Sequence, residues 1–433
     1  MLNTLVQALK NSDLRKRIIF TLLAFLVFRL MTYITVPFVN TDFLTVGMDG
    51  SLLGFANALT GGALMNFSII ALGISPYITA SIVIQLLQMD IIPVLSDWAK
   101  EGETGKQKVN QVTRYVALGM AFLQALAMAI GFDKLYGGAE GLLNVETVKP
   151  IIYVYIAIVM TAGTAALLWM ADQITIKGIG NGTSMIIMAG IVSGFPPMIR
   201  DLLNQYILED SAIKDWLIFV AVILLMVIII IGVIFMQNAT RKVPIQYANR
   251  ANSATLQGRK DSNLPIKLNP SGVIPVIFAS SIMSLPLTFA SFIDQTSAVR
   301  VWLVRIFSTT QPIGFVLYVV LIYLFSFFYS FIQVSPEKVS ENLRKQGSYI
   351  PGIRPGKETE NYISGVLMRT TVVGATYLTV IAILPILFSV FTPLPASVQI
   401  GGTSLLIVVG VAQETFKQLE TKTKQKKYSG FIK

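Results

Sequence analysis

Cysteine and histidine are both absent from the 433 residues of the chain. Without cysteine there is no disulfide framework, no thiolate metal site and no thiol nucleophile. Without histidine the chain lacks the commonest general base and the commonest metal ligand. The phosphate-binding pattern G-x-x-x-x-G-K-[ST] is missing too. We therefore predict no catalytic residue, no metal and no cofactor, and we do not expect an enzyme.

Charge is scarce as well. Only 13% of residues are charged and 54% are hydrophobic, whereas soluble domains carry about 25% charged residues. This composition predicts a polytopic membrane protein with an all-α fold. The first apolar run is a full span rather than the short core of a cleavable signal. The net charge of +11 suggests basic cytoplasmic loops rather than a nucleic-acid-binding surface.

Long apolar runs predict ten transmembrane helices. The fifth is weak because it is rich in glycine, and the tenth is short and opens on Gly401 and Gly402. Weakly apolar spans are typical of the inside of a helix bundle. The predicted spans are 18–38, 73–92, 112–132, 151–171, 183–203, 216–236, 272–293, 312–333, 366–390 and 399–416.

The loops between these spans differ in basic residues. One side carries 27 of the 34 Lys and Arg residues, the other side carries 6, and Arg29 falls within the first span. Because cytoplasmic loops are enriched in Lys and Arg, both termini are predicted to be cytoplasmic.

The stretch 56–92 is apolar but interrupted. Gly61 and Gly62 open it, and Gly73 and Pro76 break it. We expect a short helix over residues 63–72, roughly 15 Å long, in front of a helix over residues 74–92 that is long enough to span. Broken apolar backbone at membrane depth is tolerated where protein or a water-filled cavity covers it. The stretch therefore predicts a segment that lines an opening.

Charges inside the spans are few, and Arg29 is the deepest of them. It either serves a pore or ion-pair role, or it snorkels or pairs inside the bundle; the second interpretation is favoured. No span carries a row of Asp, Glu or His for proton relay. A secondary transporter for a small solute remains the alternative to a channel, although it would need binding groups at mid-membrane.

Two long basic loops lie on the predicted cytoplasmic side, at 237–271 and 334–365. In the first, VPIQYA and LPIKL are predicted to pair as strands. In the second, SPEKVSENLRKQG predicts a helix with Ser335 as N-cap and Gly347 as its stop. Both loops fit a docking surface for a partner with acidic or phosphate groups, or ordinary solvated loops. The tail 417–433 is predicted to be flexible and to lie near anionic lipid.

Six segments carry a resemblance to a known family. They are GGALMNFSIIALGISPYITASIVIQLL (61–87), EGETGKQKVNQVTRY (101–115), KGIGNGTSMIIMAGIVSG (177–194), LPIKLNPSGVIPVIFASSI (264–282), NLRKQGSYIPGIRPG (342–356) and GGTSLLIVVGVAQE (401–414). In this order and spacing they closely resemble the SecY family of protein-translocation channels, of the bacterial type. The match runs nearly end to end.

The resemblance implies two pseudo-symmetric, inverted halves, 1–205 and 206–433, that form a clamshell around an hourglass pore. It also implies a plug at about 57–70, which blocks the closed pore. The plug residues are Gly61, Gly62, Ala63, Leu64, Met65, Asn66, Phe67 and Ser68.

By the same resemblance, a constriction ring falls on residues that each lie a turn or two into an interrupted span. Spacing alone does not assemble them into a ring. Most family members have an aliphatic residue where this chain has Thr183. Aliphatic side chains close around a translocating chain without binding it, and a dry constriction resists water and ions. The ring residues are Ile74, Ile78, Thr183, Ile187, Ile277 and Ile407.

The family further implies a lateral gate between spans 2 and 7, where signal sequences and transmembrane helices leave for lipid. Candidate gate residues are Ser81, Gln85, Ser280 and Ser284. The docking candidates are Arg241, Lys242 and Arg354 in the two cytoplasmic loops. The implied function is the pore subunit of the secretion translocon in the bacterial plasma membrane. The implied partners are preproteins, small SecE-like and SecG-like subunits, and the SecA motor or the ribosome.

Overall fold

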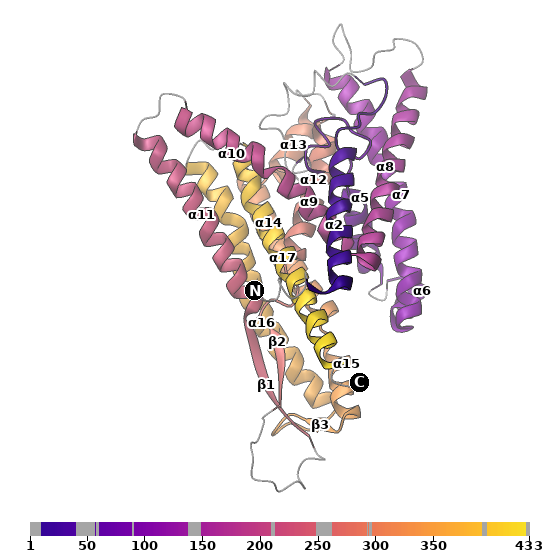
Figure 1. Ribbon diagram of the computed structural model, residues 1–433, viewed down its shortest axis with the longest axis vertical. Coiled ribbons are helices and arrows are strands. Elements are labelled where there is room, and N and C mark those ends of the chain that lie inside the picture. Colours follow the sequence, from indigo (N-terminus) through magenta and orange to yellow (C-terminus); the bar gives the residue numbers. More distant parts are fainter. Residues whose placement is uncertain are drawn as a thin grey trace.

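The computed structural model describes residues 10–39, 57, 60–88, 91–136, 149–208, 213–247, 262–291, 293, 297–391 and 396–429. Its membrane part is a bundle of helices that run roughly along one axis, and a small sheet projects from one end (Figure 1). The helices of the first part of the chain are α2 (Ser12–Met31), α5 (Ser75–Leu87), α6 (Pro93–Lys100), α7 (Glu103–Tyr136), α8 (Lys149–Lys177), α9 (Gly182–Ser193), α10 (Phe195–Leu203) and η1 (Asn204–Leu208).

The second part of the chain contributes α11 (Ile213–Asn238), α12 (Ile274–Ser291), α13 (Ala298–Phe307), α14 (Pro312–Gln333), α15 (Pro336–Lys345), α16 (Lys357–Phe391) and α17 (Ala396–Ser429). Every one of the ten predicted spans overlaps a helix. Among the described residues, six stretches are long and apolar enough to cross a membrane, and α5 and most of α12 are shorter apolar helices. The prediction of an all-α membrane fold is confirmed, and the count of ten spans fits it.

Three predicted boundaries near the N-terminus were wrong. The first helix begins at Ser12, where the Asn11 side chain accepts a hydrogen bond from the Asp13 amide at 3.2 Å, and it ends at Met31 rather than at residue 38. The second, α5, has 13 residues, about 20 Å of helix, rather than the full span expected to residue 92. Ile92 is extended (φ −114°, ψ 108°), because a residue before proline avoids helical geometry.

The expected helix over residues 63–72 was also wrong. Residues 61–74 form a series of turns, and non-local hydrogen bonds hold their backbone. The amide of Val36 donates to the Phe67 carbonyl at 3.0 Å, and the amide of Ile69 donates to the Ile34 carbonyl at 2.9 Å. Phe67 has a positive φ of 42°, which breaks helical geometry. These bonds tie the segment to the chain that follows α2.

The predicted fifth span is divided at Gly194. Asn181 caps α9 by accepting from the Thr183 amide at 3.1 Å. A new helix, α10, then begins at Phe195. Its next two residues are prolines, which suit the first turn because amides there need no helical partner.

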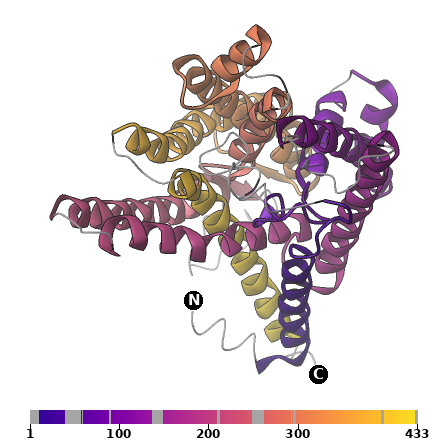
Figure 2. The same cartoon turned by 90° about the horizontal axis from the view of Figure 1, so that it is seen from above.

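Helices α2, α5, α7 and α8 lie on one side of the bundle and α11–α16 on the other (Figure 2), whereas α10 extends beside α11 and the end of α17 extends beside α2. On one side α7 packs against α5 and α8, and on the other α14 packs against α12 and α16. The two groups meet where α5 contacts α12 and where α17 contacts α9 and α10.

The projecting sheet confirms the predicted hairpin. Strand β1 (Thr240–Tyr247) pairs antiparallel with β2 (Ser262–Lys267), with Val243 opposite Leu264. The short strand β3 (Ser348–Tyr349) pairs with the far end of β1. The predicted helix α15 is confirmed as well, with Ser335 as N-cap and Gly347 at φ 63°. A small apolar core joins the sheet to α15 and α16, and it includes Val243, Ile266, Leu343 and Ile363. We call this unit the hairpin domain.

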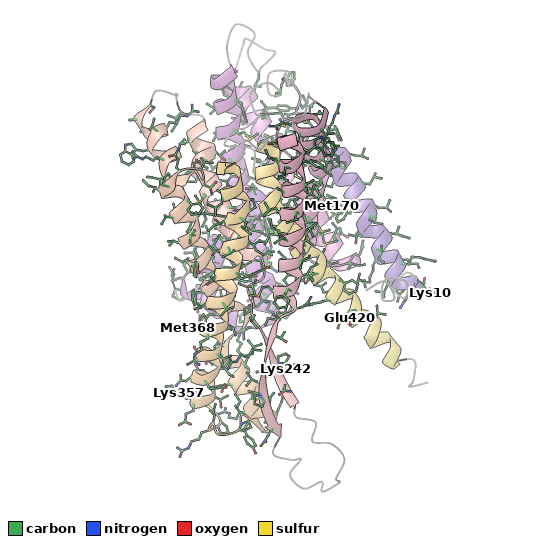
Figure 3. The ribbon with its side chains drawn as sticks, turned by 90° about the vertical axis from the view of Figure 1, so that its left-hand side faces the viewer. Lys10, Met170, Lys242, Lys357, Met368 and Glu420 are labelled. Atoms are coloured by element: carbon green, nitrogen blue, oxygen red, sulfur yellow. The ribbon has the colours of Figure 1, made fainter. Side chains whose placement is uncertain are left out.

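The tail was wrongly predicted to be flexible, because α17 continues as one helix to Ser429. Its extension packs back on the N-terminal helices, where Leu419 clusters with Leu14 and Ile179. Figure 3 shows Glu420 on this projecting end of α17, on the side of the molecule where α2 starts near Lys10.

Candidate functional site: an aliphatic constriction

Four helices bring five isoleucines into one buried cluster. Ile74 is the N-cap of α5 and follows Gly73, whose φ of 56° allows the chain to turn into the helix. Ile78 lies one turn further. Ile187 lies in α9, Ile277 in α12 and Ile407 in α17. All five are at most 8% exposed and belong to the same apolar core.

Three members of this group line one small cavity. Ile74, Ile78 and Ile187 surround it together with Phe28, Ile186 and the backbone turn at Gly73. The walls are mainly apolar; the lining also includes Ser75 and Thr60, and the Thr60 hydroxyl already donates to the Asn57 carbonyl at 3.0 Å. Apolar side chains of this kind offer no hydrogen bond to water, an ion or a peptide. The arrangement fits a dry seal rather than a site for chemistry.

Thr183 is placed differently from the isoleucines. It lies in the first turn of α9 and is only partly buried. Its hydroxyl donates to the Asn181 side-chain oxygen at 2.6 Å. Thr183 is therefore part of the cap of α9, and its hydroxyl already has a partner.

Residues 60–73 lie against this cavity and are densely packed. Ala63, Phe67 and Ile70 are each fully buried. Phe67 meets Phe132 of α7 edge-on, with ring centroids 5.8 Å apart. Gly163 of α8 allows the closest approach, because a Cβ there would lie 2.0 Å from the Ile69 carbonyl oxygen. The segment therefore packs closely between α7 and α8.

Two side chains contact the Gly61 carbonyl at the start of this segment. The Arg29 guanidinium donates to the Gly61 carbonyl at 2.8 Å and to the Tyr33 hydroxyl at 2.8 Å. The Ser193 hydroxyl reaches the same carbonyl at 3.4 Å. Arg29 thus lies in the last turn of α2 rather than at its middle. Its guanidinium donates to uncharged oxygens, a carbonyl and a hydroxyl, rather than to a carboxylate.

The four gate candidates lie on the two helices that meet, but they face different neighbours. Gln85 donates to Ser81 at 2.9 Å within α5, and its side-chain oxygen is buried with no partner among the described residues. Ser280 lies 3.4 Å from the Tyr318 hydroxyl of α14. Ser284 lines a cavity shared by residues 60–75, α7 and α12. Ser284 is therefore the candidate that the structure places between these elements.

The three docking candidates are exposed on the hairpin domain. Arg241 and Lys242 lie near the membrane end of β1, where Arg241 pairs opposite Ile266. Arg354 follows β3, which pairs with the opposite end of β1 at Gln246, about 17 Å further along the strand. Lys242, Lys357 and Met368 are labelled in Figure 3, where Lys242 lies on the hairpin.

Arg354 and Lys345, on the same loop, differ in their ion pairing. Lys345 pairs with Glu341 at 2.9 Å, and this hydrogen bond lowers the pKa of the Glu341 carboxyl. Arg354 forms no ion pair within the described part of the chain, while its own carbonyl accepts from Thr359 at 2.9 Å. This hydrogen bond holds the backbone of Arg354, and its guanidinium remains able to pair with an acidic group of another molecule.

Sequence reasoning missed the bonds that join distant segments. No local pattern predicts that Gly61 meets Arg29, that Gly163 receives the Ile69 carbonyl, or that Leu419 packs on Leu14. The conspicuous Arg29 was the one available signal.

Comparison with known proteins identifies the family of this chain. The SecY family model matches residues 68–416, which is most of the chain. The chain belongs to the SecY family. Proteins named protein translocase subunit SecY from Halalkalibacterium halodurans and Bacillus licheniformis are 48% and 47% identical to it, and each alignment covers 100% of both chains. These names support a protein-conducting channel and not a solute transporter.

Solved structures agree on the SecY fold. A structure described as a protein-conducting channel superposes with a TM-score of 0.65 at 18% identity, over 94% of this chain and 92% of that one. Another, described as showing that the plug domain of SecY stabilises the closed channel, gives 0.63 at 18% identity over the same shares. A third belongs to a canine ribosome–channel complex, with a TM-score of 0.62 at 17% identity, over 94% of this chain and 92% of that one.

Proposed function

We propose that this chain is the central pore subunit of a secretion translocon, a gated and passive channel for unfolded preproteins. The observation that carries the proposal is the buried group of five isoleucines drawn from α5, α9, α12 and α17. Ile74, Ile78, Ile187, Ile277 and Ile407 form the constriction, and Thr183 lies at its edge. The chain itself is not an enzyme, because a motor or elongating ribosome supplies the work.

The segment at about 57–70, of which the structure describes residue 57 and residues 60–70, acts as the plug in this proposal. It blocks the pore from one side, seated on α7 and α8 by apolar contacts and held in front by Arg29. Its contacts with α7 and α8 are apolar, which suits a part that must leave those helices and return, whereas its backbone hydrogen bonds join it to residues 34–36. Gly73 then separates the movable segment from α5, which stays in place.

Two halves, 1–205 and 206–433, open like a clamshell in this proposal. The lateral gate is the contact of α5 with α12, where Ser284 faces a cavity and the two helices part to release signal sequences or transmembrane helices into lipid. This contact suits a gate because the hydrogen bonds of its polar candidates stay within their own half.

The hairpin domain is the docking surface, with Arg354 as its main charge and Arg241 and Lys242 as supporting ones. Its partners are the SecA motor and the ribosome, and small SecE-like and SecG-like subunits complete the channel. In this proposal the domain and both termini are cytoplasmic, with anionic lipid near the basic tail, and the Lys and Arg asymmetry of the loops supports that orientation.

Reconstituted vesicles test this function directly. With SecA and ATP, the chain with its small subunits is expected to move a signal-bearing preprotein into the lumen. Failure with all components present and folded would contradict the proposal.

Replacing Ile407 with serine tests the constriction. Ile407 is 1% exposed, so the change leaves a gap and a polar group in the seal, costing the closed state about 2–4 kcal/mol. We expect ion leak and export of preproteins with defective signals. Ile158→Ser on α8, where the side chain is 56% exposed, is the control. Equal behaviour of the two variants would contradict the ring.

A further inference from the structure

Helix α13 carries an apolar face that no described residue covers. Val299, Val301 and Trp302 are 58%, 57% and 59% exposed, and with Ala298 and Arg305 they fall on one side of the helix by its 3.6-residue period. The opposite side faces the protein, where Phe307 packs against the main apolar core. A soluble surface rarely leaves such a face open to water.

The position of α13 across the molecule follows from its neighbours. Helices α12 and α14 are antiparallel, because Ser280 meets Tyr318 while Phe278 meets Phe325, further along α14. The end of α12 and the start of α14 therefore lie at the same end of the bundle, and α13 joins them there. Figure 1 shows α13 near the end of the bundle opposite the hairpin domain.

The length of α14 sets the depth of α13. Its 22 residues span about 33 Å, close to the roughly 30 Å hydrocarbon thickness of a bilayer. Its other end leads into α15, whose surroundings form the hairpin domain core. When the hairpin domain is in water on one side, α13 therefore lies at the membrane boundary on the other side.

A stripe of exposed apolar residues also lies on α14, which packs against α13. On α14, Ile313, Val316, Val320 and Leu324 are 47–60% exposed and recur every three or four residues, so they form one apolar line. That line begins directly after α13. A bilayer that covers this stripe also reaches the face of α13.

The charges of α13 match lipid headgroups. The helix holds two arginines and no acidic residue. Arg300 is turned inward and donates to the Ile293 carbonyl at 3.2 Å. Arg305 is exposed, with its guanidinium 5.9 Å from the centre of the Trp302 ring. Tryptophan is enriched at membrane boundaries, and a guanidinium binds phosphate well.

We propose that α13 is an interfacial helix, embedded in the headgroup layer of the leaflet opposite the hairpin domain. Trp302 lies at the boundary between headgroups and acyl chains, and Arg305 binds lipid phosphate. Because α13 packs on α12, it fixes the depth of one gate helix; this last consequence rests on the proposed function, whereas the lipid contact does not.

Tryptophan fluorescence tests the location. The chain has 4 tryptophans, so Trp98→Phe, Trp169→Phe and Trp216→Phe leave Trp302 alone. The variant is reconstituted into vesicles whose lipids carry bromine either near the headgroup or deep in the acyl chain. We expect the shallow bromines to quench Trp302 most and aqueous iodide to quench it weakly. A matched variant that replaces all four native tryptophans with phenylalanine and carries Ile158→Trp, at a position 56% exposed near the middle of the predicted span 151–171, should respond most to deep bromines.

Two outcomes would overturn the location. Strong iodide quenching with no effect of bromine would place α13 in water. Protection from both quenchers would mean that protein covers it, such as a second copy of the chain. Neither result depends on translocation, so neither bears on the proposed function.

Substitution of Arg305 tests the phosphate contact. In vesicles containing phosphatidylglycerol, Arg305→Gln should increase iodide quenching of Trp302, and Arg305→Lys should largely preserve protection. Vesicles of phosphatidylcholine alone should show a smaller difference if net anionic charge adds to phosphate binding. No change in Arg305→Gln with either lipid would overturn the contact. The α13 helix has no buried residue, and thermal unfolding of each variant confirms that it folds.

Discussion

The N-terminal and C-terminal helices meet along two seams that are held in different ways. At the α5–α12 seam, the polar candidates hydrogen-bond within their own helix or to α14, and a cavity adjoins Ser284. At the α9–α17 seam, bonds and apolar contacts cross between the groups. Thr415 of α17 approaches the Met185 sulfur of α9 at 3.4 Å, and Leu419 packs with Leu14 and Ile179. The contrast supports our proposal that the first seam parts while the second stays closed and serves as a hinge.

The largest expected effect comes from weakening the α9–α17 seam. Leu419 is 7% exposed, and Leu419→Ala removes most of its packing on Leu14 and Ile179. We expect a loss of about 2–4 kcal/mol of stability, seen as a lower unfolding temperature in detergent. Lys422→Ala, exposed one turn further along α17, is the control and should change little. A Leu419 variant as stable as this control would mean that the seam does not hold the halves together.

A smaller effect is expected from strengthening the α5–α12 seam. Ser284→Leu fills the cavity between residues 60–75, α7 and α12, and should stabilise the closed state by about 1–2 kcal/mol. Translocation of preproteins with weak signals should then fall, while strong signals still open the channel. Ser280→Leu, which is directed at Tyr318 instead, should lower stability without this selectivity. Unchanged signal dependence in Ser284→Leu would contradict the assignment of this seam as the gate.

Reversal of the Arg354 charge lies outside both seams and should affect stability least. The side chain is exposed, so Arg354→Glu should shift unfolding by less than about 0.5 kcal/mol. SecA-driven transport should nevertheless fall, because the partner meets a reversed charge. Lys357→Glu, at the start of α16, is the matched control. Equal loss of protein abundance and of transport in Arg354→Glu would mean that its effect is structural.

Local patterns predicted the fold well wherever the structure depends on neighbours in the sequence. Apolar length placed a helix at each predicted span, and turn residues placed the hairpin and α15. Prediction failed where distant contacts decide. Residues 61–74 are held by contacts with Thr35–Val36 and Gly163 rather than by a regular series of helical hydrogen bonds. The tail is helical, and Leu419 in it packs against Leu14.

The candidate site shows the same limit. Spacing alone could not join Ile74, Ile187 and Ile407, which are far apart in the sequence; resemblance to the SecY family suggested the group, and the structure buries its isoleucines together. Thr183, the one departure from the family pattern, has its hydroxyl bound to Asn181. Arg29 stood out as a charge, but its partner, the Gly61 carbonyl, is a backbone group that carries no sequence signal.

The central claim is that one seam opens while the other does not, and crosslinking tests it most directly. The chain has no cysteine, so introduced thiols are the only ones. A short bismaleimide joins Ser75→Cys to Ser284→Cys, which line one cavity, or Leu14→Cys to Leu419→Cys, which share one cluster. Each single-cysteine variant treated with the reagent is a control. We predict that the first bridge abolishes SecA-driven translocation and the second leaves it intact. Translocation through the channel bridged between Ser75→Cys and Ser284→Cys would contradict the account.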